Sequence, residues 1–167
     1  MIKNVFFLSI LALFAGNFNC ISISFADEKI ISDPLEASIK ISSSGMQAQS
    51  QRLKVVAQNI ANSNVTGKTP NENPYRRKII FFKNVYDPKL DAKVLKVDSI
   101  KEDQSDFTLK YEPNHPAADN NGMVKYPNVN IIIETVDSKE AQRTFDANVN
   151  SLEIAKSNQN KVLELMR

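Results

Sequence analysis

The sequence of 167 residues predicts an α+β protein with a long helix near each end and a small β-rich insert between them. Three observations support this fold class. Apolar residues recur at intervals of seven over residues 39–60, and a second seam with polar interruptions follows alternating steps of four and three over residues 141–166. Between these stretches, short runs rich in β-branched and aromatic residues are separated by turn signals, which is typical of strands.

The first 26 residues have the pattern of a secretory signal. Lys3 precedes an apolar run at residues 5–15, and Ser24 and Ala26 stand at the two positions that a signal peptidase reads. We predict a leader over residues 1–26 with cleavage before Asp27, which suggests export by the Sec route. A membrane anchor is the alternative, but the apolar run is short for a membrane span.

Composition and charge exclude several classes of function. Lys and Arg total 21 against 19 Asp and Glu, and a net charge of +2 gives no strong attraction to nucleic acid. Cys20 is the only cysteine and lies in the leader, so the chain from Asp27 onward has no disulfide or thiol chemistry. No glycine-rich phosphate loop or nucleophile elbow occurs, and we expect no catalytic residue, no cofactor and no small-molecule substrate.

Two polar features were candidates for a binding site. His115 is the only histidine, and a metal site built on it would need carboxylates such as Glu112 and Asp119. Because prolines flank it closely, we interpret His115 as a rigid loop residue and expect no metal. The basic cluster at residues 76–78 is too short to indicate a nucleic-acid surface, and we interpret it as strand-edge charge that discourages wrong pairing.

The N-terminal helix, within residues 27–67, has a dense start signal. Asp33 can cap the helix, Pro34 suits its first turn, and Glu36 stands three residues after the cap. We expect the helix to end near residues 64–67, with Gly67 in the left-handed terminal conformation.

The seam of this helix is half apolar and half polar. Its apolar positions are Ile39, Met46, Leu53 and Ile60, and the interleaved positions are Leu35, Ser42, Gln49 and Val56. The small residues at 42–45 are weak helix formers, but they allow another helix to approach closely.

The middle insert, residues 68–128, carries the strand signals. We expect strands in the second half of residues 75–82, around 94–100, over 107–111 and, shortest, over 123–126. Turns are indicated at residues 87–88 and 120–122, and the two prolines at 113 and 116 exclude a helix there.

The C-terminal helix occupies residues 129–167. Taken locally, Ile131 to Ile133 favour a strand, and the helical pattern is strong only from Asp137, with Glu140 three residues later. Its seam positions are Ala141, Phe145, Asn148, Leu152, Ala155, Gln159, Val162 and Met166. An ordinary amphipathic helix covering a core is the alternative interpretation.

The two seams can pair with each other because they lie at the two ends of the chain. Polar seam residues such as Gln49 and Asn148 make that pair weak in isolation. We therefore infer that the helices need further partners, supplied by other copies of the chain or by other proteins.

Three stretches resemble motifs of the flagellar axial proteins. The first is Ser44-Gly45-Met46 followed by an apolar helix ending in Asn59-Ile60-Ala61-Asn62, and the second is the tail motif at residues 141–149. The third, narrower stretch comprises residues 111–119, 122–124 and 127–130, and it is similar to the proximal rod members of this family.

This resemblance implies a structural subunit of the basal-body rod. The terminal helices would form a coaxial antiparallel hairpin, with the second helix starting near Asn130, and copies would stack helically around the central export channel. The rod would cross the periplasm and transmit torque. The implied partners are other copies of the chain, other rod proteins and the ring at the inner membrane, and no cofactor is implied.

The residues expected to carry assembly come from the two seams and the two terminal motifs: Ile39, Met46, Leu53, Val56, Asn59, Ile60, Asn62, Arg143, Phe145, Asn148, Leu152, Ala155 and Val162. For Asn59 and Asn62 two roles are open. Their amides either bridge to the backbones of neighbouring subunits or cap the end of the helix.

The leader departs from this family, whose rod members leave the cell through the flagellum's own export apparatus. It is a Sec signal, an unusual extension, or the result of a misassigned start codon. It also supports an alternative function, a secreted periplasmic binding module unrelated to motility. A periplasmic hydrolase acting on the cell wall is a third hypothesis, which would need a pair of acids or a metal site.

Overall fold

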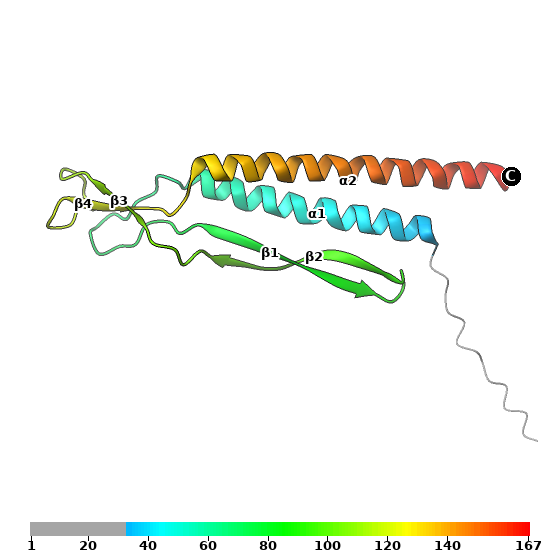
Figure 1. Cartoon of the computed structure of the whole chain (residues 1–167), viewed down its shortest axis with the longest axis horizontal. Coiled ribbons are helices and arrows are strands. Elements are labelled where there is room, and N and C mark those ends of the chain that lie inside the picture. Colours follow the sequence, from blue (N-terminus) through cyan, green and yellow to red (C-terminus); the bar gives the residue numbers. More distant parts are fainter. Residues whose placement is uncertain (1–32) are drawn as a thin grey trace, which may run out of the picture. The chain divides into compact units, whose positions relative to one another are not determined.

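The computed structural model describes residues 33–167, and the predicted leader lies outside the described residues. In chain order the elements are α1 (Pro34–Ala61), β1 (Lys78–Asp87), β2 (Ala92–Glu102), β3 (Thr108–Tyr111), β4 (Met123–Tyr126) and α2 (Ile131–Leu165), as Figure 1 shows. The α+β class is therefore confirmed. Neither helix of the described part is long and apolar enough to cross a membrane.

The start of α1 is as predicted, but its end is not. The Asp33 carboxylate accepts a hydrogen bond from the Leu35 amide, and Pro34 begins the first turn. The helix ends at Ala61, with Asn62 as its cap, and Gly67 does not adopt a positive φ. Gly67 is needed for another reason, because an added Cβ there would collide with the backbone carbonyl of Glu72.

The local strand interpretation of residues 131–133 is wrong, and the start implied by the family resemblance is right. The Asn130 side chain accepts hydrogen bonds from the amides of Ile132 and Ile133, so these residues form the first turn of α2. A cap of this kind outweighs the weak strand preference of three β-branched residues. Asp137 lies inside the helix and forms an ion pair with Arg52 instead of capping.

The four strands form two separate antiparallel pairs, β1 with β2 and β3 with β4. In the first pair, Phe81 faces Ser99 and Phe82 faces Val97, so Asp98 is an extra residue that makes a β-bulge in β2. The predicted turns are confirmed: the Leu90 amide bonds to Asp87, and Gly122 has a φ of 75°. The segment from Pro113 to Pro116 contains turns and no helix.

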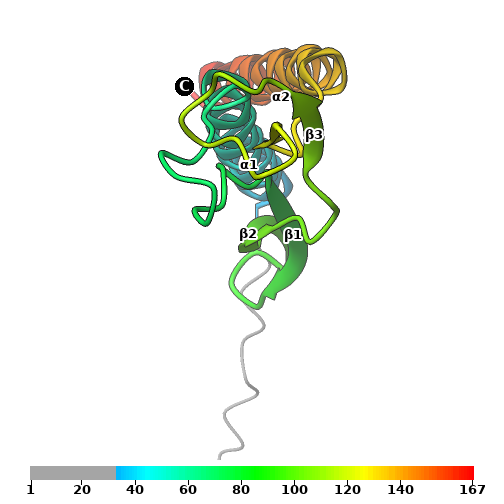
Figure 2. The ribbon, with the colours of Figure 1, turned by 90° about the vertical axis from the view of Figure 1, so that its left-hand side faces the viewer.

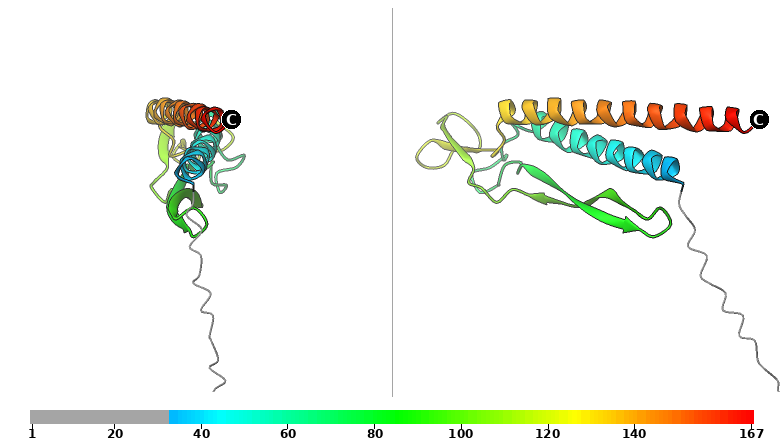
Figure 3. Two further views of the ribbon diagram at one scale, coloured as in Figure 1. Left: turned by 90° about the vertical axis from the view of Figure 1, so that its right-hand side faces the viewer. Right: turned by 45° about the vertical axis from the view of Figure 1, so that its right-hand side comes forward.

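Within residues 33–167, α1 lies between α2 and the β1–β2 pair. The two helices run side by side in opposite directions (Figures 1 and 3), and the end-on view in Figure 2 shows the strands on the side of α1 that faces away from α2. The buried apolar residues are correspondingly few and small: Ala48, Val55, Val56, Leu90, Val94, Ala117, Val124, Ala141 and Ala155.

Candidate assembly site

The contact between α1 and α2 is close where side chains are small. Gly45 faces Asn148, and a Cβ added to Gly45 would lie 2.7 Å from the Asn148 Oδ1 atom. The predicted close approach of a second helix to residues 42–45 is thus confirmed at Gly45. Further along, Arg52 contacts Asp137, and contacts continue to the end of α1.

Most of the predicted assembly residues on α1 lie within this packed region. Val56 and Asn59 are buried, whereas Ile39, Met46, Leu53, Ile60 and Asn62 are half-buried. The polar seam residues Ser42 and Gln49 are more deeply buried than the apolar Ile39, Met46, Leu53 and Ile60. The Oε1 atom of Gln49 is buried without a hydrogen-bond partner in the described part of the chain, which lowers the stability of the helix pair.

On α2 the predicted residues divide into two groups. Ala155 is buried, and Phe145, Asn148 and Leu152 are half-buried along the face toward α1. Arg143 and Val162 are exposed. The structure therefore brings most seam residues of the two helices together, and the role of each predicted residue in assembly stays a prediction.

Asn59 joins α1 to the beginning of β1. Its Oδ1 atom accepts hydrogen bonds from the Lys78 amide at 2.9 Å and the Tyr75 hydroxyl at 2.8 Å. Its Nδ2 atom donates to the Lys78 carbonyl at 2.9 Å and to the Glu134 carboxylate at 3.0 Å. The Asn59 amide thus pairs with the Lys78 backbone as a neighbouring strand would, and neither role proposed from the sequence describes it.

For Asn62 the capping alternative is the observed one, because its Nδ2 atom donates to the Gln58 carbonyl at 2.7 Å. The Gln58 carbonyl also accepts the Asn62 backbone amide at 3.1 Å, so the backbone and side chain of Asn62 together close the last turn of α1.

A buried ion pair connects the start of β1 to α2. The Glu134 side chain is 1% exposed, and its Oε1 atom accepts a hydrogen bond of 2.6 Å from Arg77 Nε. The same guanidinium lies 3.5 Å from the Asp103 carboxylate and 3.6 Å from that of Asp137. The interpretation of residues 76–78 as strand-edge charge is therefore wrong for Arg77, whose charge is directed into the molecule.

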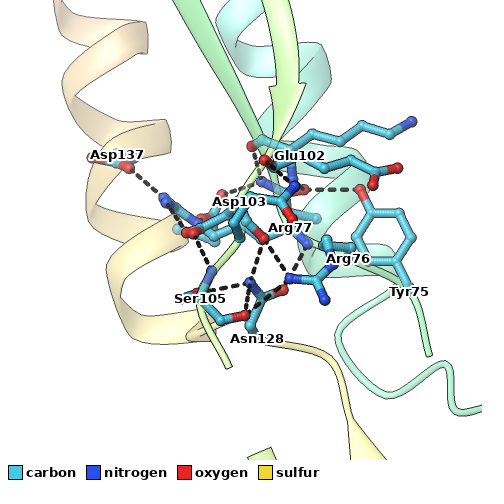
Figure 4. Close-up of polar contacts among 12 residues, drawn as sticks. Tyr75, Arg76, Arg77, Glu102, Asp103, Ser105, Asn128 and Asp137 are labelled. Carbon is cyan, nitrogen blue, oxygen red and sulfur yellow. Dashed lines mark hydrogen bonds and ion pairs between the residues drawn. The ribbon is translucent and has the colours of Figure 1, made fainter. Parts of the chain in front are cut away.

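Side chains around this ion pair form hydrogen bonds to the segment that follows β2, at residues 103–105 (Figure 4). Arg76 donates to the carbonyls of Asp103 and Ser105 at 2.8 and 3.0 Å, and its guanidinium lies 4.2 Å from the centre of the Phe107 ring. The Asn128 amide accepts from the Arg77 amide and donates to the Asp103 carbonyl and the Ser105 hydroxyl. Four chain segments are thus linked at one end of the helix pair.

The network also shifts the ionisation of its members. Burial raises the pKa of the Tyr75 hydroxyl, and the negative charges of Glu134 and Glu102 raise it further. Burial alone would lower the pKa of Arg77, but the hydrogen bond and charge of Glu134, together with Asp103, outweigh burial and raise it. A hydrogen bond from the Ser105 amide lowers the pKa of Asp103, and the nearby charge of Arg77 contributes to the same shift.

The carboxylates near His115 are directed elsewhere. Glu112 accepts hydrogen bonds from the Tyr126 hydroxyl, and Asp119 accepts from the amides of Asn121 and Met123. His115 Nδ1 accepts from the Ala117 amide. Within residues 33–167, no group of three His, Cys, Asp or Glu side chains is arranged to hold a metal ion.

Sequence reasoning missed Glu134 and Arg77, which organise this end of the molecule. Glu134 follows three isoleucines and stands close to Val136. A single charged residue in an apolar stretch signals a buried, paired charge, and this signal was available in the sequence. Its partner was not identifiable, because Arg77 lies 57 residues away in the chain.

Both helices expose large apolar side chains away from their mutual contact. On α1 the exposed residue is Ile41, at 43%. Those of α2 are concentrated in its first two turns and its last two, with one between: Ile131, Ile132, Ile133, Val136, Ile154, Val162, Leu163 and Leu165. Apolar surface gathered in this way is typical of protein–protein contact.

Two family models match the chain. The model described as flagella basal body rod protein matches residues 39–67, and the model described as flagellar basal body rod FlgEFG protein C-terminal matches residues 120–165. These ranges include most of α1 and all of α2.

Curated relatives match over most of their length. The chain is 49% identical over 117 residues to the flagellar basal-body rod protein FlgC of Agrobacterium fabrum, covering 70% of this chain and 84% of the relative. Identity to FlgC of Salmonella typhimurium is 42% over 126 residues, covering 75% and 92%. Identity to FlgC of Bacillus subtilis is 34% over 143 residues, covering 77% and 95%.

Proposed function

The chain belongs to the FlgC family of flagellar basal-body rod proteins, and on that premise we propose that α1 and α2 carry its assembly into the rod. It is a structural subunit of the basal body and not an enzyme. Rod proteins of this family associate with themselves and with other rod components. The alternative of a secreted binding module unrelated to motility has no support from the relatives.

In this proposal the two helices form a coaxial antiparallel hairpin that faces the central export channel. The middle insert, residues 68–128, lies outside that layer. Support comes from the opposite directions of α1 and α2 and from the close approach at Gly45. A helical stack of such subunits transmits torque along the rod, and the ring at the inner membrane is the partner at its base.

The observation that carries the proposal is the exposed apolar surface of α2. Ile154 is 63% exposed, although it lies on the same helix as the buried Ala155 and the half-buried Leu152. The face of α2 toward α1 is therefore filled, and a second apolar face is left for other subunits. Contacts between different faces of a subunit produce open helical assemblies instead of closed dimers.

Replacing Ile154 by aspartate tests this proposal. Ile154→Asp places a charge on the exposed face without touching the seam, so we expect unchanged helical content by circular dichroism. We also expect the chain to be missing from purified basal bodies and the cells to stop swimming. Ser157→Asp, an exposed polar position on the same helix, is the matched control and should assemble normally. Normal incorporation of Ile154→Asp would contradict the proposal.

We further propose that residues 1–26 are a Sec signal that is removed before Asp27 and that the subunit reaches the rod from the periplasm. The support is the charged, apolar and small-residue pattern of the leader. Mass spectrometry of the chain recovered from basal bodies should give Asp27 as the first residue. An intact Met1 would contradict cleavage, and a start between these positions would identify a misassigned start codon.

A further inference from the structure

We propose that Asn121 is a site of spontaneous covalent modification, at which the side-chain amide is lost as ammonia and the residue becomes aspartate or isoaspartate. The inference concerns the turn that precedes β4 and does not depend on how the subunit assembles. The reaction needs no enzyme and no reactant other than water, because the chain itself supplies the nucleophile and the group that it attacks.

The two reacting groups are neighbours in the chain. The backbone nitrogen of Gly122 attacks the side-chain carbonyl carbon of Asn121, and ammonia leaves with the proton that the nitrogen has lost. The product is a five-membered succinimide ring, which water opens at either of its two carbonyls. Opening at the side-chain carbonyl gives aspartate on an ordinary main chain. Opening at the main-chain carbonyl gives isoaspartate, whose main chain runs through the former side chain.

The sequence at this turn favours the reaction. Asn-Gly occurs once in the chain, at residues 121–122. Glycine has no Cβ, so the attacking nitrogen and the new ring are unobstructed. Serine, the next smallest residue found after an asparagine, follows Asn62 and Asn150. The amide of Asn62 is bonded to the Gln58 carbonyl, and Asn150 lies inside α2, where the helix holds the following nitrogen.

The Asn121 side chain is free to reach the nitrogen of Gly122. It is exposed and makes no hydrogen bond within residues 33–167, where only its backbone amide is bonded. By contrast, the side-chain amides of Asn59 and Asn128 donate to main-chain carbonyls and are held in place. A free amide can rotate toward the next residue, whereas a bonded one must first give up its partner.

The turn restrains the attacking nitrogen. The Gly122 amide donates to the Asp119 carbonyl at 2.9 Å. The Asp119 carboxylate accepts from the amides of Asn121 and Met123, both at 2.8 Å. The nitrogen of Gly122 must release its bond and lose its proton before it can attack, so the reaction takes place while the turn is locally open. We therefore infer that Asp119 controls the rate in the folded chain.

The fold requires the glycine of this pair but not the asparagine. Gly122 has a φ of 75°, and an added Cβ would lie 2.8 Å from the Tyr111 ring. The turn uses only the backbone of Asn121. Asn121→Ser should therefore remove the reactive amide and leave the turn intact.

The isoaspartate product would disturb the start of β4. Its main chain is one atom longer just before Gly122, whose carbonyl accepts the Glu112 amide at 2.9 Å. The next residue, Met123, pairs with Tyr111, and Val124 after it is fully buried. The extra atom shifts this pairing, so isoaspartate should loosen the β3–β4 pair. The aspartate product leaves the main chain unchanged and adds only a negative charge.

Peptide mapping of the purified chain after incubation at physiological temperature and slightly alkaline pH tests the proposal. Trypsin cleaves after Lys110 and Lys125 and releases one peptide with Asn114, Asn120 and Asn121, so two asparagines of the same loop serve as internal controls. Replacement of the amide group by a hydroxyl raises the peptide mass, and fragmentation locates the site. An isoaspartate-specific methyltransferase measures isoaspartate, and digestion in heavy-oxygen water marks any conversion that occurs during digestion.

We expect Asn121 to convert before the other two asparagines, to both products, and faster still in chains unfolded by guanidinium. Asp119→Ala releases the turn and should raise the rate about tenfold, and Asp119→Asn, which keeps a weaker acceptor, should lie between. Glu112→Ala is the matched control, because the Glu112 side chain bonds to the Tyr126 hydroxyl and to no amide of the turn. It should leave the rate unchanged, and circular dichroism verifies that each variant is folded.

Several results would overturn the inference. One is an Asn121 amide that stays intact in the folded chain after many half-lives of the reaction in the unfolded chain. Others are faster conversion at Asn114 or Asn120, or equal rates in the Asp119 and Glu112 variants. Hydrogen exchange of the β4 amides should accelerate as isoaspartate accumulates, but not in the Asn121→Ser chain. Unchanged exchange in both chains would contradict the effect on the β3–β4 pair.

Discussion

The helix pair is held together in different ways at its two ends. Where α1 ends, Asn59, Arg77 and Glu134 form a buried polar network that also includes the start of β1. Toward the start of α1, the contact consists of small residues such as Gly45, and the opposite stretch of α2 continues into exposed apolar turns. One end is thus held by paired polar groups and the other by small residues. Exposed apolar side chains lie at both ends of α2, at Ile131, Ile132 and Ile133 and again at Val162, Leu163 and Leu165.

This difference indicates how one subunit can be both ordered and ready to assemble. A buried ion pair contributes little net stability but is strongly position-specific, so it fixes which residues of α1, β1 and α2 meet. Apolar surface is less specific in direction and gains free energy only when a partner covers it. We infer that the polar network sets the register of the helices and that the exposed apolar turns of α2 are left for other subunits.

The largest expected effect is at the polar end. Arg77→Met leaves the buried Glu134 carboxylate without its charge partner, and we expect it to lower the free energy of unfolding by about 3–5 kcal/mol. Urea denaturation of the purified chain measures this loss. Arg76→Met is the matched control and should cost about 1 kcal/mol, because Arg76 bonds only to carbonyls and contacts Phe107. Equal losses would show that Glu134 does not depend on Arg77.

Asn59→Ala should have the next largest effect. It removes four hydrogen bonds and leaves the Lys78 amide and carbonyl unpaired, so we expect a loss of about 2–3 kcal/mol in the free energy of unfolding. Asn62→Ala, three residues later at the end of the same helix, is the matched control. It removes one side-chain hydrogen bond to the Gln58 carbonyl and should lower the free energy of unfolding by about 1 kcal/mol or less. If the two variants were equally stable, Asn59 would not be the anchor of β1.

Gly45 sharpens the comparison at the other end. Gly45→Ala should stabilise the chain through its higher helix propensity and destabilise it through a steric clash with Asn148. The free energy of unfolding should therefore be nearly unchanged. In an Asn148→Ala background the contact is gone, and the same substitution should stabilise by about 1 kcal/mol. Thermal unfolding of the four chains measures this coupling. An equal gain in both backgrounds would mean that the helices do not approach closely at Gly45.

The smallest effect concerns Tyr75 and pH. Tyr75→Phe removes one hydrogen bond to Asn59 and should cost about 1 kcal/mol at neutral pH. Because the folded state raises the pKa of Tyr75 above 10.0, its protonated form contributes stability below that pH, and this contribution is lost as the pH rises through the folded pKa.

Unfolding measured from pH 9 upward should therefore show a shallower alkaline decline for Tyr75→Phe than for the unmodified chain. Tyr111→Phe is the control, since Tyr111 is 70% exposed and should leave the decline unchanged. An identical decline in all three chains would contradict the role assigned to burial and Glu134.

Features governed by neighbouring residues were predictable from the sequence. Asp33 caps α1, the turn at Gly122 has the positive φ that its sequence demanded, and four strands occur where β-branched and aromatic residues indicated them. Each of these depends on a few adjacent residues whose conformational preferences agree. Much of the seam was predictable for the same reason, since helical periodicity places its members on one face.

Features governed by distant partners were not predictable. Gly67 stands where the sequence favours a glycine cap of the helix. Its observed role is to leave room for the Glu72 carbonyl, which an added Cβ would touch. Arg77 carries no local sign that its charge is directed inward, because Glu134 and Asp103 are brought to it only by the packing of α2 and β2. The helical state of residues 131–133 likewise depended on the Asn130 cap, which the local strand preference concealed.

The bulge at Asp98 decides how the hairpin tolerates changes in length. Beyond it, β2 pairs with β1 as far as Lys78 and Glu102, and the Asp103 amide bonds to the Arg77 carbonyl. Deleting Asp98 would remove the bulge and leave Ser99 to Glu102 in register. Deleting one residue between Ser99 and Glu102 would turn the later side chains to the opposite face and carry Asp103 away from Arg77. Changes in length are therefore tolerated best at the bulge and in the connecting turn at residues 88–91, and worst between Ser99 and Asp103.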